Sequence, residues 1–317
     1  MRRIPGLGKV RDIHASESED VVRIIEGMGR SGGFMAKNLR QLCAVLDSMY
    51  RRPNCTKFLS FPAAVVATGA RGLLVDLVRE GMVDVIVTTC GTLDHDIART
   101  KADYYQGSFE MDDVRLRRAG YHRLGNILLP LDSYGPLIEK TVRPLLGRIY
   151  DSGARSITSE RLSAEIGRTL GPRSLLYWAE RKGVPVFVPG ITDGAVGSQL
   201  WLFAESHRDF KLDPLGDERR LSDITSEARE TGALVLGGGI SKHHVIWWNL
   251  FRGGLDYACY VTTASEFDGS LSGAQVREAV SWGKVKVGAE QANLNAEVTT
   301  VLPFIASYVV TKKRKRT

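Results

Sequence analysis

The stretch ALVLGGGISKHH, residues 233–244, decides the fold of this chain. Its apolar start is typical of a buried strand, and the three glycines favour a tight turn into a helix. Such a turn leaves backbone N–H groups bare at the helix start, where a phosphate or a ring can approach them. It is not the dinucleotide fingerprint GxGxxG, because Lys242 stands where the last glycine should be. A purely structural turn is an equally good interpretation of these glycines.

Further units of the same kind lie on both sides of this stretch. Strand-like runs at 56–59, 83–88, 184–188 and 257–262 alternate with helical patterns at 18–28, 34–49, 136–150 and 174–182. Alternation of this kind predicts an α/β fold, a Rossmann-like doubly wound, mainly parallel sheet flanked by helices. Because there is no repeat and no low-complexity linker, we expect a single domain over residues 1–310 and a basic C-terminal tail over 311–317.

Composition excludes several classes of protein. The 317 residues carry a formal charge of +7, but five of the positive charges lie in the run 312–316, which we expect to be a solvated, frayed end. The remaining 38 basic and 36 acidic residues give no basic face for nucleic acid. No apolar run is long enough to span a membrane. The four cysteines form no CxxC pair, so we expect a cytoplasmic protein without a metal site.

Two short segments carry the side chains best suited to chemistry. His243 and His244 stand at a predicted helix start, where a neutral imidazole can accept a proton, although a capping or packed histidine is the commoner case. The segment EAVSWGK brings Glu278, Trp282 and Lys284 within seven residues. A lysine beside an indole can be partly desolvated and form an imine, and the indole can hold a substrate cation, although most lysines are solvated surface charges.

Taken together, the motifs resemble those of deoxyhypusine synthase. The resemblance covers residues 25–308 and is most specific in the heptapeptide that ends at Lys284. It also includes the stretches at 82–89, 123–126, 192–194, 236–244, 263–264, 266–270 and 272–274. Because the N-terminus is short, an archaeal-type branch of the family is our hypothesis.

This resemblance implies an NAD-dependent transferase. Enzymes of the family move an aminobutyl group from spermidine to one lysine of the precursor of translation initiation factor 5A, and they are homotetramers with active sites at dimer interfaces. Lys284 would form the imine and His243 would transfer protons. The implied substrate-binding residues are Glu278, Trp282, Tyr260, Leu250, Gly237, Gly239, Asp94 and His95. The implied NAD-binding residues are Thr89, Gly91, Asp193, Gly238, Thr263, Ala264, Asp268, Gly269, Ser272 and Glu297.

The chain departs from the family pattern at the donor-binding end. Ser198 and Leu271 stand where acids are common, and Trp247 replaces an asparagine. Other departures are Ala63 and Ala64 for a Ser-Asn pair and His95 for an acid. A buried ammonium without a carboxylate is costly, so either Asp94 or Asp96 compensates or the donor differs, with agmatine as the other candidate. A homospermidine synthase and a non-catalytic NAD-binding relative remain as further interpretations.

Overall fold

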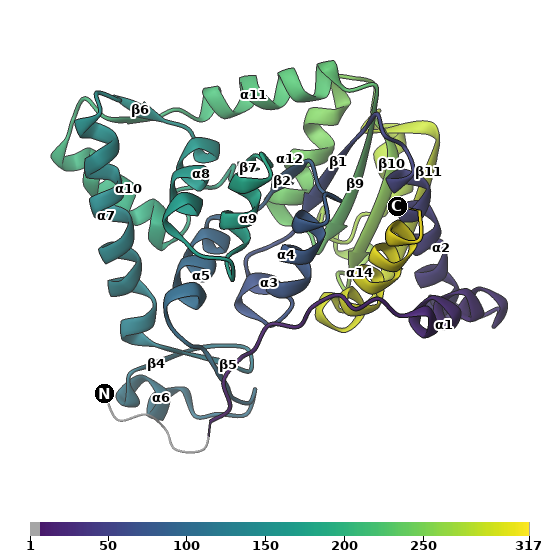
Figure 1. Cartoon of the computed structure of the whole chain (residues 1–317), viewed down its shortest axis with the longest axis horizontal. Coiled ribbons are helices and arrows are strands. Elements are labelled where there is room, and N and C mark those ends of the chain that lie inside the picture. The colour runs from purple at the N-terminus through teal and green to yellow at the C-terminus, as the bar shows by residue number, and fades with distance from the viewer. Residues whose placement is uncertain (1–6, 317) are drawn as a thin grey trace.

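A six-stranded sheet forms the centre of the computed structural model (Figure 1). The model describes residues 7–316, so residues 1–6 of the predicted domain and Thr317 of the predicted tail lie outside it. In spatial order the strands are β11 (Val285–Asn295), β10 (Leu255–Thr262), β9 (Glu230–Leu236), β1 (Cys55–Ser60), β2 (Val85–Val87) and β7 (Val186–Phe187). Every neighbouring pair is parallel, which confirms the predicted α/β sheet.

Helices cover both faces of this sheet, because successive side chains of each strand point to opposite sides. In β9, Leu234 and Leu236 join the core that contains α2 (Phe34–Tyr50), α4 (Arg71–Arg79) and α14 (Val298–Arg314). Ala233 and Val235 join the opposite core, with α12 (Gly239–Leu250) and α13 (Val276–Ser281). The two cores explain why the strands read as nearly continuous apolar runs.

The remaining elements extend the fold around the main sheet. Two small sheets add β3 (Tyr105–Gln106), β5 (Ile127–Pro130) and β4 (Tyr121–Leu124), and β6 (Ser156–Ile157) beside β8 (Lys211–Leu212). The other helices are α1 (Glu19–Arg30), α3 (Ala64–Ala67), α5 (Cys90–Lys101), α6 (Asp113–Ala119), α7 (Gly135–Asp151), α8 (Ser159–Thr169), α9 (Leu175–Arg181), α10 (Ala195–Ser206) and α11 (Pro214–Glu227). Between residues 7 and 316, no helix is both long and apolar enough to cross a membrane.

The edge strand β7 is shorter than the run 184–188 that predicted it. Pro185 has no N–H to donate, so it takes part in the sheet only by accepting a hydrogen bond from Ile86 N. Val188 N donates to Ser159 Oγ of α8, at 2.9 Å, instead of to a strand. The missing N–H of Pro185 and the side-chain acceptor of Val188 N therefore limit the strand to two residues.

The basic C-terminal residues are not frayed, so that expectation is wrong. Helix α14 continues to Arg314, and its end packs beside α1 and α4. Lys315 pairs with Glu19 at 2.5 Å, and Arg314 pairs with Glu80 at 2.6 Å and also with Glu17. Acidic residues from the N-terminal quarter of the chain thus neutralise much of the basic run.

Candidate active site

The strand order reverses between β1 and β9. From β1 the chain adds β2 and β7 on one side, and it then returns to add β9, β10 and β11 on the other. In such sheets ligands bind outside the carboxyl ends of the strands at the reversal. Gly237 follows β9 with φ of 81°, and a Cβ atom there would lie 3.1 Å from Pro62, which follows β1. The triple-glycine turn therefore stands at the reversal, where a side chain would crowd the other strand's loop.

A cavity of about 160 Å³ beside this turn contains Lys284. It is lined by Lys242, His243, Ile246, Tyr260, Leu271, Ala274, Gln275, Glu278, Ala279, Trp282 and Lys284. Lys284 is only 7% exposed, and its Nζ lies 5.0 Å from the Trp282 ring and 5.6 Å from the Trp247 ring. Within the described part of the chain, this amine has no hydrogen-bond or ion-pair partner. An amine held by two indoles and otherwise uncommitted is suited to nucleophilic attack.

His243 is placed to exchange protons in the same cavity. Its ring stacks on Trp247 with centroids 5.5 Å apart and an interplanar angle of 21°. Burial, and then the nearby Lys284 ammonium, lower the pKa of His243 below its ordinary value. The imidazole is therefore neutral at neutral pH and can accept a proton. Glu278 is exposed on α13 at the edge of this cavity, so its carboxylate can meet an arriving cation.

Sequence reasoning missed Lys242, a second lysine in this cavity. The side chain is 1% exposed, and its Nζ donates to Ala274 O at 2.6 Å. Burial lowers the pKa of Lys242 to about 8. The available signal was its position in the turn that follows β9, where Lys242 breaks the glycine fingerprint and belongs to the motif at 236–244, with no role predicted for it.

A second cavity of about 330 Å³ adjoins the first at the end of β10. It contains Thr263 and Ala264, two of the residues predicted to bind NAD, and it shares Tyr260, Ala274 and Gln275 with the Lys284 cavity. The predicted residues Thr89 and Gly91 follow β2, Asp193 follows β7, and Gly238 follows β9. All of them stand at the same edge of the sheet, because parallel strands end on one side.

Three other predicted NAD-binding residues are engaged in local structure. Asp268 accepts a hydrogen bond from Ser270 N in the turn that includes Gly269. Ser272 Oγ accepts from Gly239 N at 3.0 Å, and this contact ties the loop after β10 to the start of α12. Glu297 caps α14 by accepting from Thr299 N and Thr300 N. These contacts fix the loops around the second cavity.

Asp94 and His95, predicted to bind substrate, are buried and hydrogen-bonded within the fold. Asp94 has no exposed surface and accepts hydrogen bonds from Ala195 N and Val196 N at the start of α10. His95 is buried against Tyr104, and burial lowers the pKa of His95 to about 4. Neither residue lines the Lys284 cavity, and both carboxylate oxygens of Asp94 already accept hydrogen bonds, so a contact of Asp94 with the donor stays a prediction.

Asp96 and Leu250 also lie outside the lining of this cavity. Asp96 is fully buried, and its carboxylate accepts from Leu175 N and Leu176 N at the start of α9. Leu250 is half-buried at the end of α12, with Cδ1 3.3 Å from the Cβ position of Gly283. Leu271, one of the departures from the family pattern, does line the cavity. Glu278 is therefore the one carboxylate in the described lining of the Lys284 cavity, which it shares with basic, amide, apolar and aromatic side chains.

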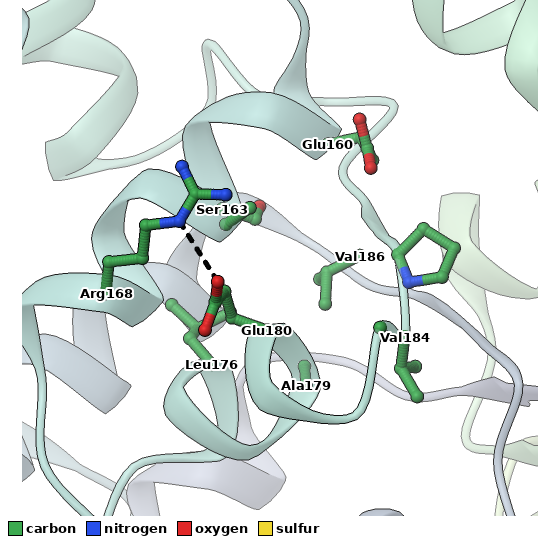
Figure 2. Close-up of a pocket in the computed structure, with 11 residues that line it drawn as sticks. Glu160, Ser163, Arg168, Leu176, Ala179, Glu180, Val184 and Val186 are labelled. Carbon is green, nitrogen blue, oxygen red and sulfur yellow. Dashed lines mark hydrogen bonds and ion pairs between the residues drawn. The ribbon is translucent and has the colours of Figure 1, made fainter.

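Another cavity, of about 190 Å³, lies between α8, α9 and the edge strand β7 (Figure 2). Its Arg168 and Glu180 are joined to each other at 3.0 Å, as the dashed line in Figure 2 shows. The remaining lining is mostly aliphatic and contains no cysteine, histidine or lysine. We therefore assign the candidate active site to the Lys284 cavity.

Comparison with known proteins gives the family of the chain. The family model described as deoxyhypusine synthase matches residues 23–309. The chain belongs to the deoxyhypusine synthase family. A Picrophilus torridus protein named "Probable deoxyhypusine synthase" is 48% identical over 94% of this chain and 96% of its own length. The protein of the same name from Ignicoccus hospitalis is 47% identical over 96% of this chain and 97% of its own.

The deoxyhypusine synthase fold is also found among solved structures. A crystal structure from Entamoeba histolytica, provisionally assigned as a deoxyhypusine synthase, superposes with a TM-score of 0.66. It is 22% identical and covers 90% of this chain and 91% of its own, so it supports the fold alone. Membership of the family makes the chain an enzyme of the transferase class.

Proposed function

We propose that this chain transfers an aminobutyl group from spermidine to one lysine of the initiation factor 5A precursor, with NAD as cofactor and an imine at Lys284. The observation that carries the proposal is the Lys284 amine, buried between two indoles and free of any described partner. The family membership and the neutral His243 in the same cavity support it.

The residues at the carboxyl edge of the sheet fit NAD. Thr263 and Ala264 line a cavity beside that of Lys284, and Gly237 to Gly239 open α12 without side chains. A backbone of this kind can approach a pyrophosphate at a helix start, although Gly239 N is already bonded to Ser272. Bound here, NAD would store the hydride taken from the donor and return it to the product.

The chain's own residues supply the rest of the chemistry. His243 accepts the proton that the donor nitrogen loses, because its imidazole is neutral. Lys284 Nζ then bonds to the four-carbon fragment as an imine, and the C–N bond to the three-carbon diamine breaks. The acceptor lysine displaces Lys284 and takes over the imine, which is reduced in the product. Glu278 forms an ion pair with the charged end of the donor, and the indole face of Trp282 attracts the same charge.

Agmatine is a second candidate donor, and the composition of the cavity favours considering it. Glu278 is the one carboxylate in the lining, and Leu271 adds an apolar side chain where the family commonly has an acid. A guanidinium is more weakly hydrated than an ammonium and stacks well on indoles such as Trp282. If the acceptor were a small diamine, the same imine chemistry would make the chain a homospermidine synthase. If the chain formed no imine, it would be a non-catalytic relative that binds NAD.

A homotetramer in the cytoplasm is also part of the proposal. Trp247, Phe251 and Trp282 expose 40%, 64% and 64% of their surfaces. Trp282 lines the Lys284 cavity, the Trp247 ring lies 5.6 Å from Lys284 Nζ, and the Phe251 ring lies 6.1 Å from that of Trp247. An exposed aromatic group of this size is typical of surfaces that meet another protein. A second subunit or the acceptor protein would cover it.

The deciding experiment is mass spectrometry of the purified precursor after incubation with this chain, NAD and either donor. A spermidine-dependent aminobutyl adduct is expected, together with borohydride-trapped label on Lys284 that Lys284→Arg abolishes. An adduct that forms with agmatine and not with spermidine would show that agmatine is the donor. Label without transfer to the precursor, but with transfer to putrescine, would make the chain a homospermidine synthase, and no label would indicate a non-catalytic relative.

A further inference from the structure

Lys242 is a buried cation for which the proposed chemistry has no use. It follows the triple glycine on α12, directly before His243, and it lines the Lys284 cavity. The side chain is 1% exposed, and within the described residues it forms no ion pair with a carboxylate. Glu278 in the lining of the same cavity attracts the ammonium without forming an ion pair with it, so the closer contacts must compensate for most of the lost hydration.

Those contacts all come from the wall of the cavity. Nζ donates to Ala274 O at 2.6 Å and to Ser272 O at 3.4 Å, and it lies 4.4 Å from the centre of the Tyr260 ring. Two carbonyl oxygens and a ring face are thus held by one charge. Because its protons are committed in this way, Lys242 is poorly placed to act as a nucleophile, in contrast to Lys284.

The groups that Lys242 holds separate the two cavities of the site. Tyr260, Ala274 and Gln275 line both the cavity of Lys284 and the cavity of Thr263. The segment 272–274 is also tied to α12 through Ser272 Oγ, which accepts from Gly239 N. Without the ammonium, this segment would keep only that bond to the helix and its own turn bonds, Gly273 N to Ser270 O and Ala274 N to Leu271 O.

We propose that Lys242 is a positioning residue, whose ammonium fixes the wall formed by Tyr260 and residues 272–274 between the donor cavity and the cofactor cavity. The inference rests on the proposed function for its catalytic consequence only. A fixed wall sets the distance and the angle at which donor and cofactor face each other across it. Small misplacements at such a point reduce the rate of the chemical step strongly while binding changes little.

The first test needs no substrate. Hydrogen exchange is measured on Lys242→Met and on Lys57→Met, a matched control. Lys57 is also mostly buried and donates to a carbonyl, Cys55 O at 2.7 Å, but it lies on β1 outside both cavities. We expect the amides of 272–276 to exchange about tenfold faster in Lys242→Met, with the rest of the sheet unchanged, and no change there in Lys57→Met. Equal exchange rates of the amides of 272–276 in wild type and Lys242→Met would refute the proposal that Lys242 fixes this wall.

The second test measures NADH formation in the first turnover. Lys242→Met should slow this step by about a hundredfold, with half-saturating concentrations of NAD and donor changed less than about threefold. Lys242→Arg, which keeps the charge, should recover part of the rate. A wild-type rate in Lys242→Met, or a defect confined to binding, would overturn the positioning role. If Lys242→Met does not fold, Lys242→Gln replaces it in both tests.

The two proposals can fail separately. If the wild-type protein forms no NADH with either donor, the proposed function fails, and the exchange experiment alone decides whether Lys242 fixes the wall. If wild type is active and the amides near residue 274 exchange equally fast in wild type and Lys242→Met, the positioning role of Lys242 fails while the proposed function stands.

Discussion

Replacing Asp94 by alanine should destabilise the fold and leave donor recognition intact. The resemblance to the family implied a substrate contact for this residue, whereas the structure buries it completely at the start of α10. Its carboxylate accepts from Ala195 N at 2.9 Å, from Val196 N at 2.8 Å and from the Tyr134 hydroxyl at 2.7 Å. Removing it leaves two backbone donors and one phenol without their acceptor.

The expected loss follows from these three bonds. A hydrogen bond to a charged group contributes about 1.5–3 kcal/mol. Burial raises the pKa of Asp94, which means that the ionised carboxylate is itself penalised, so we take the lower part of this range. At about 1.5 kcal/mol for each of the three bonds, the free energy of unfolding should fall by about 4.5 kcal/mol. At about 2 °C for each kcal/mol in a chain of this size, Tm should fall by about 9 °C.

Thermal unfolding of Asp94→Ala and Ser198→Ala, measured in parallel, checks this reasoning. Ser198 is a suitable control because it lies on the same helix and its exposed hydroxyl donates only to Gly194 O. Its removal should cost less than about 0.5 kcal/mol. An Asp94→Ala protein that melts with the wild type but needs far more donor would show that the carboxylate serves the substrate and that the cap has been misassigned.

Three further changes test other parts of the molecule. His243→Gln should slow turnover by about 10²–10⁴-fold and remove the acid limb of the rate profile. In wild type that limb should lie below the ordinary histidine value, because the pKa of His243 is lowered and the base is lost as pH falls through it; a limb at or above pH 6.5 would contradict this. Asp12→Asn should cost about 3 kcal/mol in chemical denaturation, because Asp12 pairs with two buried arginines at 2.6 and 2.9 Å; an unchanged midpoint would count against it. Gly238→Ala should weaken NAD binding by about tenfold in calorimetry, because the new Cβ would lie 2.5 Å from Ser272 Cα; unchanged affinity would place NAD elsewhere.

Local chemistry made much of the fold predictable from the sequence. The helix predicted over 18–28 begins where expected, because Ser18 accepts a hydrogen bond from Val21 N as its cap. Gly237 takes the positive φ that its turn requires. The runs 233–236 and 257–262 form strands of the sheet, as their apolar residues predicted. Where the signal was local, the prediction was confirmed.

Predictions failed where distant partners decide the outcome. Nothing near the basic run 312–316 in the sequence shows that Glu17 and Glu80 will meet it, so a frayed end was the reasonable expectation. In the sequence, nothing near Asp94 shows that its carboxylate accepts hydrogen bonds from the first N–H groups of α10, about a hundred residues later. Lys242 donates its hydrogen bonds to carbonyl groups about thirty residues away, which the local sequence does not indicate. Side chains of this kind need the tertiary structure to be interpreted.

The meeting of α1 and α14 has a consequence for the order in which the chain folds. Ser16 N donates to Ser307 Oγ and Ser18 N donates to Thr311 Oγ1, across separations of 291 and 293 residues. Glu26 accepts from the Tyr308 hydroxyl. Contacts of such span form late, because closing a long loop costs entropy before the contact returns any stability. During synthesis, α1 is made well before α14, so it completes its docking only after the residues of α14 have followed.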